Sequence, residues 1–316
     1  MADSHAISKA LYAGVDVGGT NAAVGLLDAE GRLLEVVKRP TEAELGGDAL
    51  ASKLADMISG LLDGHGADGK DLKAVGLGIP GFLDPERGVV MSAANLNMHD
   101  YPIAGRLSAH LGGTPVSIDN DVRMYIYGEA MTGAAAGYQH VFGVTVGTGL
   151  AAATINKGEI LYGAGYLAGE IGHHTVDGNS YVCGCGMTGC LETLVSAGGI
   201  VRQARDRGLN VNSAGDVSKA YDAGDPAAIE VFEHTGLALG RALSVVATLL
   251  SPDIIVIGGG VSLAGERLLG PVRRALNERT HPLYGERIVL APAKWNDEAG
   301  IIGSAMSAKA RSERLT

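Results

Sequence analysis

One pattern occurs twice in this chain, over residues 14–34 and again over residues 143–161. Each copy reads as a strand, a glycine-rich turn, a second strand, a polar turn and a third strand. This order differs from a Rossmann unit, where a helix follows the first glycine turn. Neither turn contains the Gly-Lys-Ser/Thr of a P-loop. The repeat therefore predicts a duplicated α/β architecture with a cleft between its halves.

The glycine turns are candidate phosphate sites. Gly18-Gly19-Thr20 ends the first strand of one copy, and Gly147-Thr148-Gly149 ends that of the other. Successive backbone N–H groups in such turns cradle phosphate oxygens, and Asp16 is expected to hold Mg²⁺ through water. A third turn, Gly258-Gly259-Gly260, follows an apolar strand and suits the flat face of a nucleoside. A chance hairpin explains any single turn as well, but three turns in matching contexts favour a nucleotide site.

A run of polar residues, Asp119-Asn120-Asp121, stands where the strand predicted at Pro115–Ile118 ends. Ligand sites of α/β folds lie at such strand ends. A carboxylate there can accept the proton of a hydroxyl that attacks a γ-phosphate. The competing interpretation is a helix N-cap made by these short polar side chains. Both hold if one residue caps the helix and another reacts.

All three cysteines of the chain, Cys183, Cys185 and Cys190, fall within eight residues, and His173 and His174 precede them. Three thiolates and one imidazole form a tetrahedral Cys₃His set, which is typical of structural zinc. Cys183 and Cys185 are too close for an easy disulfide, and an odd count leaves one thiol over. Either histidine could be the fourth ligand, and we favour His173.

Two carboxylates flank this set, Glu170 before it and Glu192 after it. A metal held by the cysteines would therefore order a loop that presents both carboxylates. We expect zinc to shape a binding site here and not to perform chemistry, because four protein ligands leave no open coordination position.

Composition excludes several classes of protein. The 316 residues carry 25 Lys+Arg against 35 Asp+Glu, a net charge of −10, without a clustered basic run. Nucleic-acid binding needs clustered Lys/Arg and is not expected. No window reaches the roughly 18 uninterrupted apolar residues of a membrane span. The N-terminus lacks the features of a secretory signal, so we expect a cytoplasmic protein with reduced cysteines.

Individual elements follow from hydrophobic periodicity. Strands are predicted at Leu11–Val17 and His140–Val146, and helices at Leu191–Gly208, Ala227–Leu250 and Ala299–Ala310.

Four segments together resemble the ROK family of repressors, open reading frames and kinases. They are Val15–Thr20, Ile118–Asp121 with Gly128-Glu129 after it, Val146–Gly149, and Glu170–His173 with Cys183–Glu192. The ten-residue step from His173 to Cys183 matches the spacing of that family. The resemblance covers nearly the whole chain and implies the α/β fold of actin, hexokinase and the Hsp70 ATPase domain, with ribonuclease H-like halves.

The resemblance also implies roles for individual residues. Asp121 would be the general base that takes the proton from the 6-hydroxyl of a hexose. The other residues expected to line the sugar pocket are Gly81, Asn95, Asn120, Glu170, His173 and Glu192. Those expected to hold Mg²⁺-ATP are Asp16, Gly18, Gly19, Thr20, Thr148, Gly149, Gly259 and Gly260. Zinc would be held by His173, Cys183, Cys185 and Cys190.

The sequence departs from the family pattern near the sugar. Relatives usually carry Glu-Asn-Asp-Ala-Asn where this chain has Asp119-Asn-Asp-Val-Arg123, and a Leu-Pro-Gly-Trp element where Leu96-Asn-Met-His99 follows Asn95. Glucose is the first expectation. Allose, mannose, N-acetylmannosamine and N-acetylglucosamine are its rivals, with Arg123 as a candidate contact for a sugar substituent. ATP is the expected donor and polyphosphate the alternative.

Two domains are expected, a smaller one formed by residues 1–121 with 299–316 and a larger one formed by residues 122–298. Family analogy implies a homodimer or homotetramer.

A sugar-sensing regulator is disfavoured because only about ten residues precede the first predicted strand, too few for the DNA-binding helices of ROK repressors. An actin- or Hsp70-like ATPase would lack the cysteine loop, and a dinucleotide-dependent dehydrogenase would not place a strand after Gly19.

Overall fold

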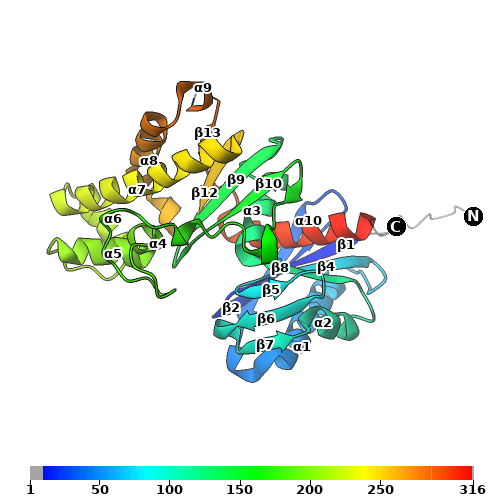
Figure 1. The fold of residues 1–316 in the computed structure, drawn as a ribbon. Coiled ribbons are helices and arrows are strands. Elements are labelled where there is room, and N and C mark those ends of the chain that lie inside the picture. The colour runs from blue at the N-terminus through cyan, green and yellow to red at the C-terminus, as the bar shows by residue number, and fades with distance from the viewer. Residues whose placement is uncertain (1–9, 286, 315–316) are drawn as a thin grey trace, which may run out of the picture. The chain divides into compact units, whose positions relative to one another are not determined.

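The structure is a computed structural model that describes residues 10–285 and 287–314. The chain divides into two compact units (Figure 1). Unit 1 comprises Met1–Gly133 and Asp297–Thr316, and unit 2 comprises Ala134–Asn296. Each unit contains its own five-stranded sheet and its own hydrophobic core.

The two sheets have the same topology. The strand order is β3-β2-β1-β4-β8 in unit 1 and β11-β10-β9-β12-β13 in unit 2. In both sheets the first three strands along the chain pair antiparallel, and the last two add parallel to them. The predicted duplication is therefore confirmed. The strands of unit 1 are β1 (Leu11–Val17), β2 (Asn21–Leu27), β3 (Leu33–Pro40), β4 (Leu72–Ile79) and β8 (Val116–Asn120). Those of unit 2 are β9 (His140–Val146), β10 (Leu150–Asn156), β11 (Glu159–Ile160), β12 (Ile254–Gly258) and β13 (Val289–Pro292).

Alternation along β1 divides the faces of the first sheet. Val15 and Val17 are fully buried in a core that also contains side chains of α1 (Gly46–Gly64) and α2 (Ile103–His110). Because successive side chains of a strand point to opposite faces, Asp16 faces the other side, where it lies against Gly300 of α10 (Ala299–Arg314). The strand thus directs a carboxylate toward the beginning of a helix.

The division into units differs from the expected domain boundary at residue 121. Helix α3 (Asp121–Met131), expected to open the second domain, belongs to unit 1. Its packing against α10 explains this, because two glycines let the backbones approach closely. A Cβ on Gly128 would lie 2.1 Å from the carbonyl oxygen of Ala299, and one on Gly303 would lie 1.7 Å from that of Met124.

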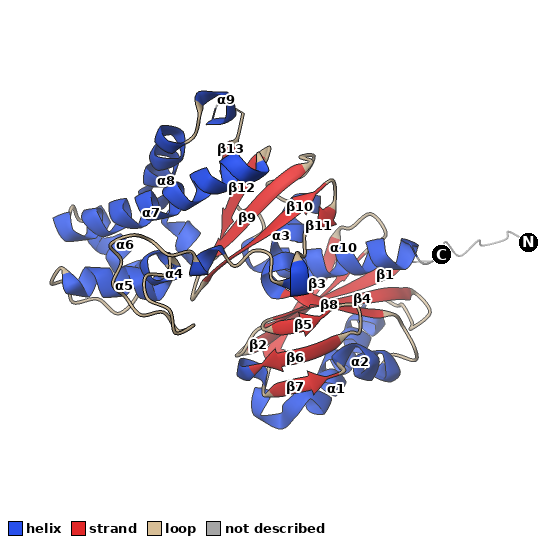
Figure 2. Ribbon diagram, viewed as in Figure 1, coloured by secondary structure: helices blue, strands red, loops and turns tan. Residues whose placement is uncertain are grey.

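A small second sheet in unit 1 was not predicted. Its strands are β5 (Phe82–Asp84), β6 (Val89–Ala93) and β7 (Met98–Tyr101), paired antiparallel in that order (Figure 2). These strands are three to five residues long and carry polar residues, so no periodicity marks them. Gly81 precedes β5, and Asn95 lies in the single helical turn Ala94–Leu96 between β6 and β7.

The predicted helix Leu191–Gly208 is wrong as a single element. The chain forms α4 (Glu192–Val195) and α5 (Ala197–Asp206), separated at Ser196, whose ψ of 164° is extended. The Ser196 hydroxyl accepts the Gly199 N–H at 3.2 Å and caps α5. This N-cap geometry stops α4 and starts a new helix.

Unit 2 also contains α6 (Ala214–Asp222), α7 (Pro226–Leu250), α8 (Glu266–Arg279) and α9 (Pro282–Gly285). Of these, α7 was predicted, whereas α6 and α8 were not. Side chains of α7 and α8 form the core together with Phe142, Val144 and Val146 of β9. Within the residues described, no helix has both the length and the apolar character needed to cross a bilayer.

Candidate active site

The candidate base lies at the junction of β8 and α3. Asn120 is the N-cap, and its Oδ1 accepts the backbone N–H groups of Val122 at 3.0 Å and Arg123 at 3.2 Å. Asp121 is the first helical residue, and burial raises the pKa of its carboxyl group, against lowering by the Val122 N–H and the Arg123 charge. A carboxylate with a raised pKa is a stronger proton acceptor at neutral pH. The capping interpretation therefore holds for Asn120, while Asp121 Oδ1 also accepts the Val122 N–H at 3.0 Å.

Asp119 and Arg123 form a buried ion pair beneath this turn. Asp119 is 1% exposed and Arg123 is 6% exposed. Arg123 Nε donates to Asp119 Oδ1 at 2.7 Å, and Arg311 of α10 lies 3.4 Å from the other carboxylate oxygen. Arg123 is thus held inside unit 1, which does not support its expected contact with a sugar substituent. The pair was missed in the sequence, although its i,i+4 spacing at a strand–helix junction is a signal for it.

Asp16 of β1 is close enough to Asp121 for the two carboxylates to interact electrostatically. Burial raises its pKa to about 6, with the negative charges of Asp121 and Asp297 adding to the effect and Lys38 opposing it. Mutual repulsion between carboxylates in one buried region is relieved by a cation. The negative charges of Asp121 and Asp297, two further acidic residues of unit 1, therefore favour the protonated form of Asp16.

The first glycine turn lies beside an expected sugar residue. Gly18 N–H donates to the carbonyl oxygen of Asn21 at 2.9 Å and closes the turn between β1 and β2. A Cβ on Gly19 would lie 3.6 Å from the Asn95 Cβ, so the turn and the small sheet meet here. Gly81 has a φ of +110°, and a Cβ there would lie 2.4 Å from the Ser92 carbonyl oxygen. Glycine is therefore required at position 81 by both conformation and space.

The other two glycine turns meet at one edge of the second sheet. Gly147 N–H donates to the Gly149 carbonyl oxygen at 2.9 Å, which closes the turn between β9 and β10. Gly259 follows β12 with a φ of +81°, and a Cβ there would lie 2.5 Å from the carbonyl oxygen of Val146, the last residue of β9. Because β9 and β12 are parallel neighbours, their carboxyl ends bring both turns together.

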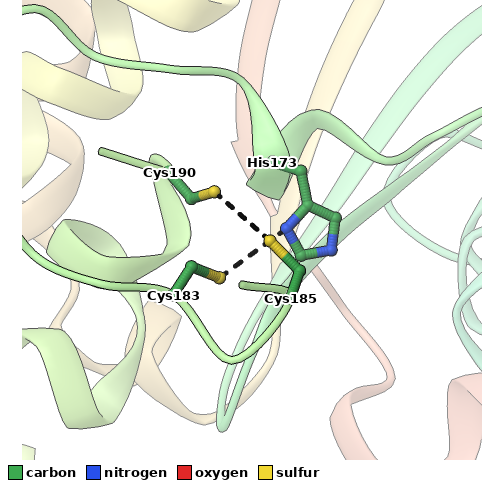
Figure 3. A group of neighbouring side chains, drawn as sticks. All are labelled: His173, Cys183, Cys185 and Cys190. Atoms are coloured by element: carbon green, nitrogen blue, oxygen red, sulfur yellow. Dashed lines mark hydrogen bonds between the residues drawn. The ribbon is translucent and has the colours of Figure 1, made fainter. Parts of the chain in front are cut away.

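The four expected zinc ligands form one cluster (Figure 3). His173, Cys183, Cys185 and Cys190 offer ligand atoms that all lie within 4.8 Å of one another. Cys183 Sγ lies 3.8 Å from His173 Nδ1, and the sulfurs of Cys185 and Cys190 lie 3.7 Å apart. Tetrahedral zinc with Zn–S bonds of about 2.3 Å separates its sulfur ligands by about 3.8 Å. The residues therefore fit zinc, and the histidine of the described cluster is His173, while His174 is exposed.

The two flanking glutamates differ in environment. Glu170 is exposed, and its Oε2 lies 3.7 Å from His173 Nε2, the ring nitrogen that faces away from the cysteines. Glu192 begins α4 and accepts the Leu150 N–H through Oε2 at 2.9 Å. The structure thus assembles Asp16, Asn95, Asn120 and Asp121 within unit 1, and the second and third turns, the cysteine cluster and both glutamates within unit 2.

Comparisons with known proteins agree with these features. The model of the ROK family matches residues 12–311. A glucokinase from Halalkalibacterium halodurans is 36% identical over 313 residues, with 94% of each chain covered. A ROK hexokinase structure from Thermus thermophilus has a TM-score of 0.84 and 32% identity, covering 96% of this chain and 99% of that one.

A ROK glucokinase from Streptomyces griseus, solved with glucose and AMPPNP, has a TM-score of 0.77 and 30% identity. The match covers 95% of this chain and 99% of that one. The expected fold class is confirmed, because the duplicated sheets are those of the actin and hexokinase group. The chain therefore belongs to the ROK family and is a sugar kinase of that family.

Proposed function

We propose that the protein transfers the γ-phosphoryl group of ATP to the 6-hydroxyl of a hexose, with glucose as the preferred substrate. The observation that carries this is the half-buried Asp121 at the first turn of α3, whose charge acts on Asp16 and whose pKa is raised by desolvation. The glucokinase relative and the glucose- and AMPPNP-bound structure of a related glucokinase support the choice of sugar and donor. Allose, mannose and the N-acetylated hexosamines remain outcomes of the substrate test.

Asp121 is the proposed general base. As the 6-hydroxyl attacks the γ-phosphate, the carboxylate takes its proton, so the oxygen becomes a better nucleophile as the new bond forms. Phosphoryl transfer needs little other covalent chemistry from a protein, so most of the rate enhancement comes from positioning and charge neutralisation. The Asn120 cap fixes the first turn of α3, which limits the positions that Asp121 can adopt.

The glycine turns are the proposed phosphate sites. Backbone N–H groups of Gly18, Gly19 and Thr20 in unit 1, and of Thr148 and Gly149 in unit 2, would donate to phosphate oxygens. Gly259 and Gly260 would lie against the adenosine. Mg²⁺ would neutralise phosphate charge near Asp16. A bound cation there would also favour the ionised form of Asp16, whose pKa of about 6 reflects burial among other carboxylates.

The sugar contacts are proposed for Gly81, Asn95 and Asn120 of unit 1 and for Glu170, His173 and Glu192 of unit 2. Zinc, when bound to His173 Nδ1 and the three cysteines, supplies structural order and leaves Nε2 of the same ring free to face a sugar hydroxyl. Glu170 lies on that side of the ring. The carboxylates can accept hydrogen bonds from vicinal hydroxyl groups, which distinguish hexoses from one another.

A coupled ADP-release assay over glucose, mannose, allose, N-acetylglucosamine and N-acetylmannosamine tests the proposal, with polyphosphate replacing ATP in a parallel series. We expect the highest kcat/KM with glucose and ATP. ATP hydrolysis that no sugar stimulates would contradict a hexose kinase, and preference for an N-acetylated sugar would replace glucose in the proposal.

A further inference from the structure

The segment that follows the last cysteine is anchored at the metal cluster. Cys190 is fully buried, and its carbonyl oxygen accepts two side-chain hydrogen bonds. Thr193 Oγ1 donates to it at 2.7 Å and Asn179 Nδ2 at 3.1 Å. The Leu191 N–H donates to the His174 carbonyl oxygen at 2.8 Å. The beginning of residues 190–197, called here the bridging segment, is therefore fixed to the loop that carries the ligands.

The bridging segment also contacts the Gly147–Gly149 turn at two points, Glu192 and Ala197. Leu150 N–H donates to Glu192 Oε2 at 2.9 Å, on one side of the turn. Ala197 N–H donates to the Gly147 carbonyl oxygen at 2.8 Å, on the other side. A Cβ on Gly149 would lie only 2.8 Å from Glu192 Oε2, so the carboxylate packs directly on the turn. Both edges of this glycine turn are thus attached to one short segment.

Glu192 also reaches back toward the cluster. Its Oε1 lies 3.7 Å from Cys183 Sγ, while Oε2 is bound to the turn. A glycine turn has many accessible conformations, and only one of them aims its N–H groups at a phosphate. Contacts that select this conformation before the ligand arrives reduce the entropy lost on binding and so increase affinity.

We propose that Glu192 is a positioning residue for the Gly147–Gly149 turn, and that the bridging segment makes nucleotide affinity depend on the order of the Cys₃His cluster. This inference rests on the proposed nucleotide site but adds a role for Glu192 that needs no sugar. The turn is held in place by the hydrogen bond from the Leu150 N–H to Glu192 Oε2, and not by the charge of the Glu192 carboxylate. An amide oxygen at the same place accepts the same N–H.

The test measures Mg²⁺-ADP affinity by titration calorimetry without sugar, in wild type, Glu192→Ala and Glu192→Gln. Asp177→Ala is the matched control, because Asp177 is an exposed carboxylate of the same loop. We expect Kd to rise about tenfold or more in Glu192→Ala. It should stay close to wild type in Glu192→Gln and Asp177→Ala. Faster amide exchange at Leu150 in the alanine variant alone is the structural signature of the lost contact.

Metal removal completes the test. Chelator-treated wild type that keeps its circular dichroism spectrum should lose nucleotide affinity to a similar extent and regain it with added zinc. If Glu192→Ala binds Mg²⁺-ADP as wild type does, the positioning role is overturned even though the protein phosphorylates a hexose. If wild type neither binds nucleotide nor phosphorylates sugars, the proposed function fails and the inference with it.

Discussion

Asp119 Oδ1 and Arg123 Nε lie 2.7 Å apart in the interior of unit 1, directly beneath the turn that carries Asp121. Arg311 lies 3.4 Å from Asp119 Oδ2 and extends this ion pair to α10. The ion pair therefore supports the β8–α3 junction, which carries the candidate base.

Removal of one partner should destabilise the protein strongly. Asp119→Ala removes the carboxylate that accepts the hydrogen bond of the buried Arg123 Nε, and we expect the free energy of unfolding to fall by about 3–5 kcal/mol. The double variant Asp119→Leu/Arg123→Met removes both charges and should recover most of this loss. Urea unfolding followed by circular dichroism measures both effects.

An exposed pair gives the matched control. Arg267 and Asp222 form an ion pair at the surface of unit 2, and Asp222→Ala should cost less than about 1 kcal/mol. A double variant no more stable than Asp119→Ala would contradict this account. It would show that the loss of stability does not come from the charge of Arg123.

Asp16 should reduce the stability of the nucleotide-free protein at neutral pH. Its folded pKa of about 6 lies above the ordinary value of 3.8, so the folded state binds a proton that the unfolded state releases. The stabilisation by this proton is complete below pH 4 and is lost as pH rises through 6. We therefore expect Asp16→Asn to gain stability relative to wild type over this range, approaching roughly 3 kcal/mol above pH 7.

Thermal unfolding of both proteins between pH 4 and pH 8 checks this expectation. The difference between wild type and variant should grow with pH and then level off, while the variant loses Mg²⁺-dependent turnover. A difference independent of pH would mean that the Asp16 carboxylate does not titrate in this range.

Loss of a cysteine ligand should affect both metal content and sugar binding. We expect wild type to hold a single zinc ion per chain and Cys185→Ser to lose most of it, with lower stability because metal binding is coupled to folding. The loop that carries Glu170 should then bind glucose more weakly. Elemental analysis and glucose titration measure these effects, and normal glucose affinity in metal-free protein would contradict the scaffold role of zinc.

Much of the fold could be predicted because local patterns determine it. β1 and β9 have the predicted bounds, since each is a short, mainly apolar run that is followed directly by glycine. The predicted helix across Ser196 was wrong because hydrophobic periodicity continues through a residue whose hydroxyl caps a new helix. β5, β6 and β7 were missed because they are only three to five residues long and no regular alternation of apolar and polar residues marks them.

The site was predictable where its residues are close in sequence. The cysteine cluster follows from spacing alone, and the structure brings His173 to it. The contribution of Arg311 to the support beneath Asp121 was not predictable, because Arg311 reaches Asp119 from a helix at the other end of the chain. The contact between Glu192 and Leu150 likewise depends on how α4 meets the β9–β10 turn.

The proposed role of Asp121 is tested most directly by single-turnover phosphorylation of glucose in wild type and Asp121→Asn, with glucose affinity measured separately. Asparagine retains the shape of the side chain but cannot take a proton, so the rate should fall by about 10²–10⁴-fold while glucose affinity stays within a few-fold of wild type. A variant that keeps half of the wild-type rate would show that another group, or none, removes the hydroxyl proton.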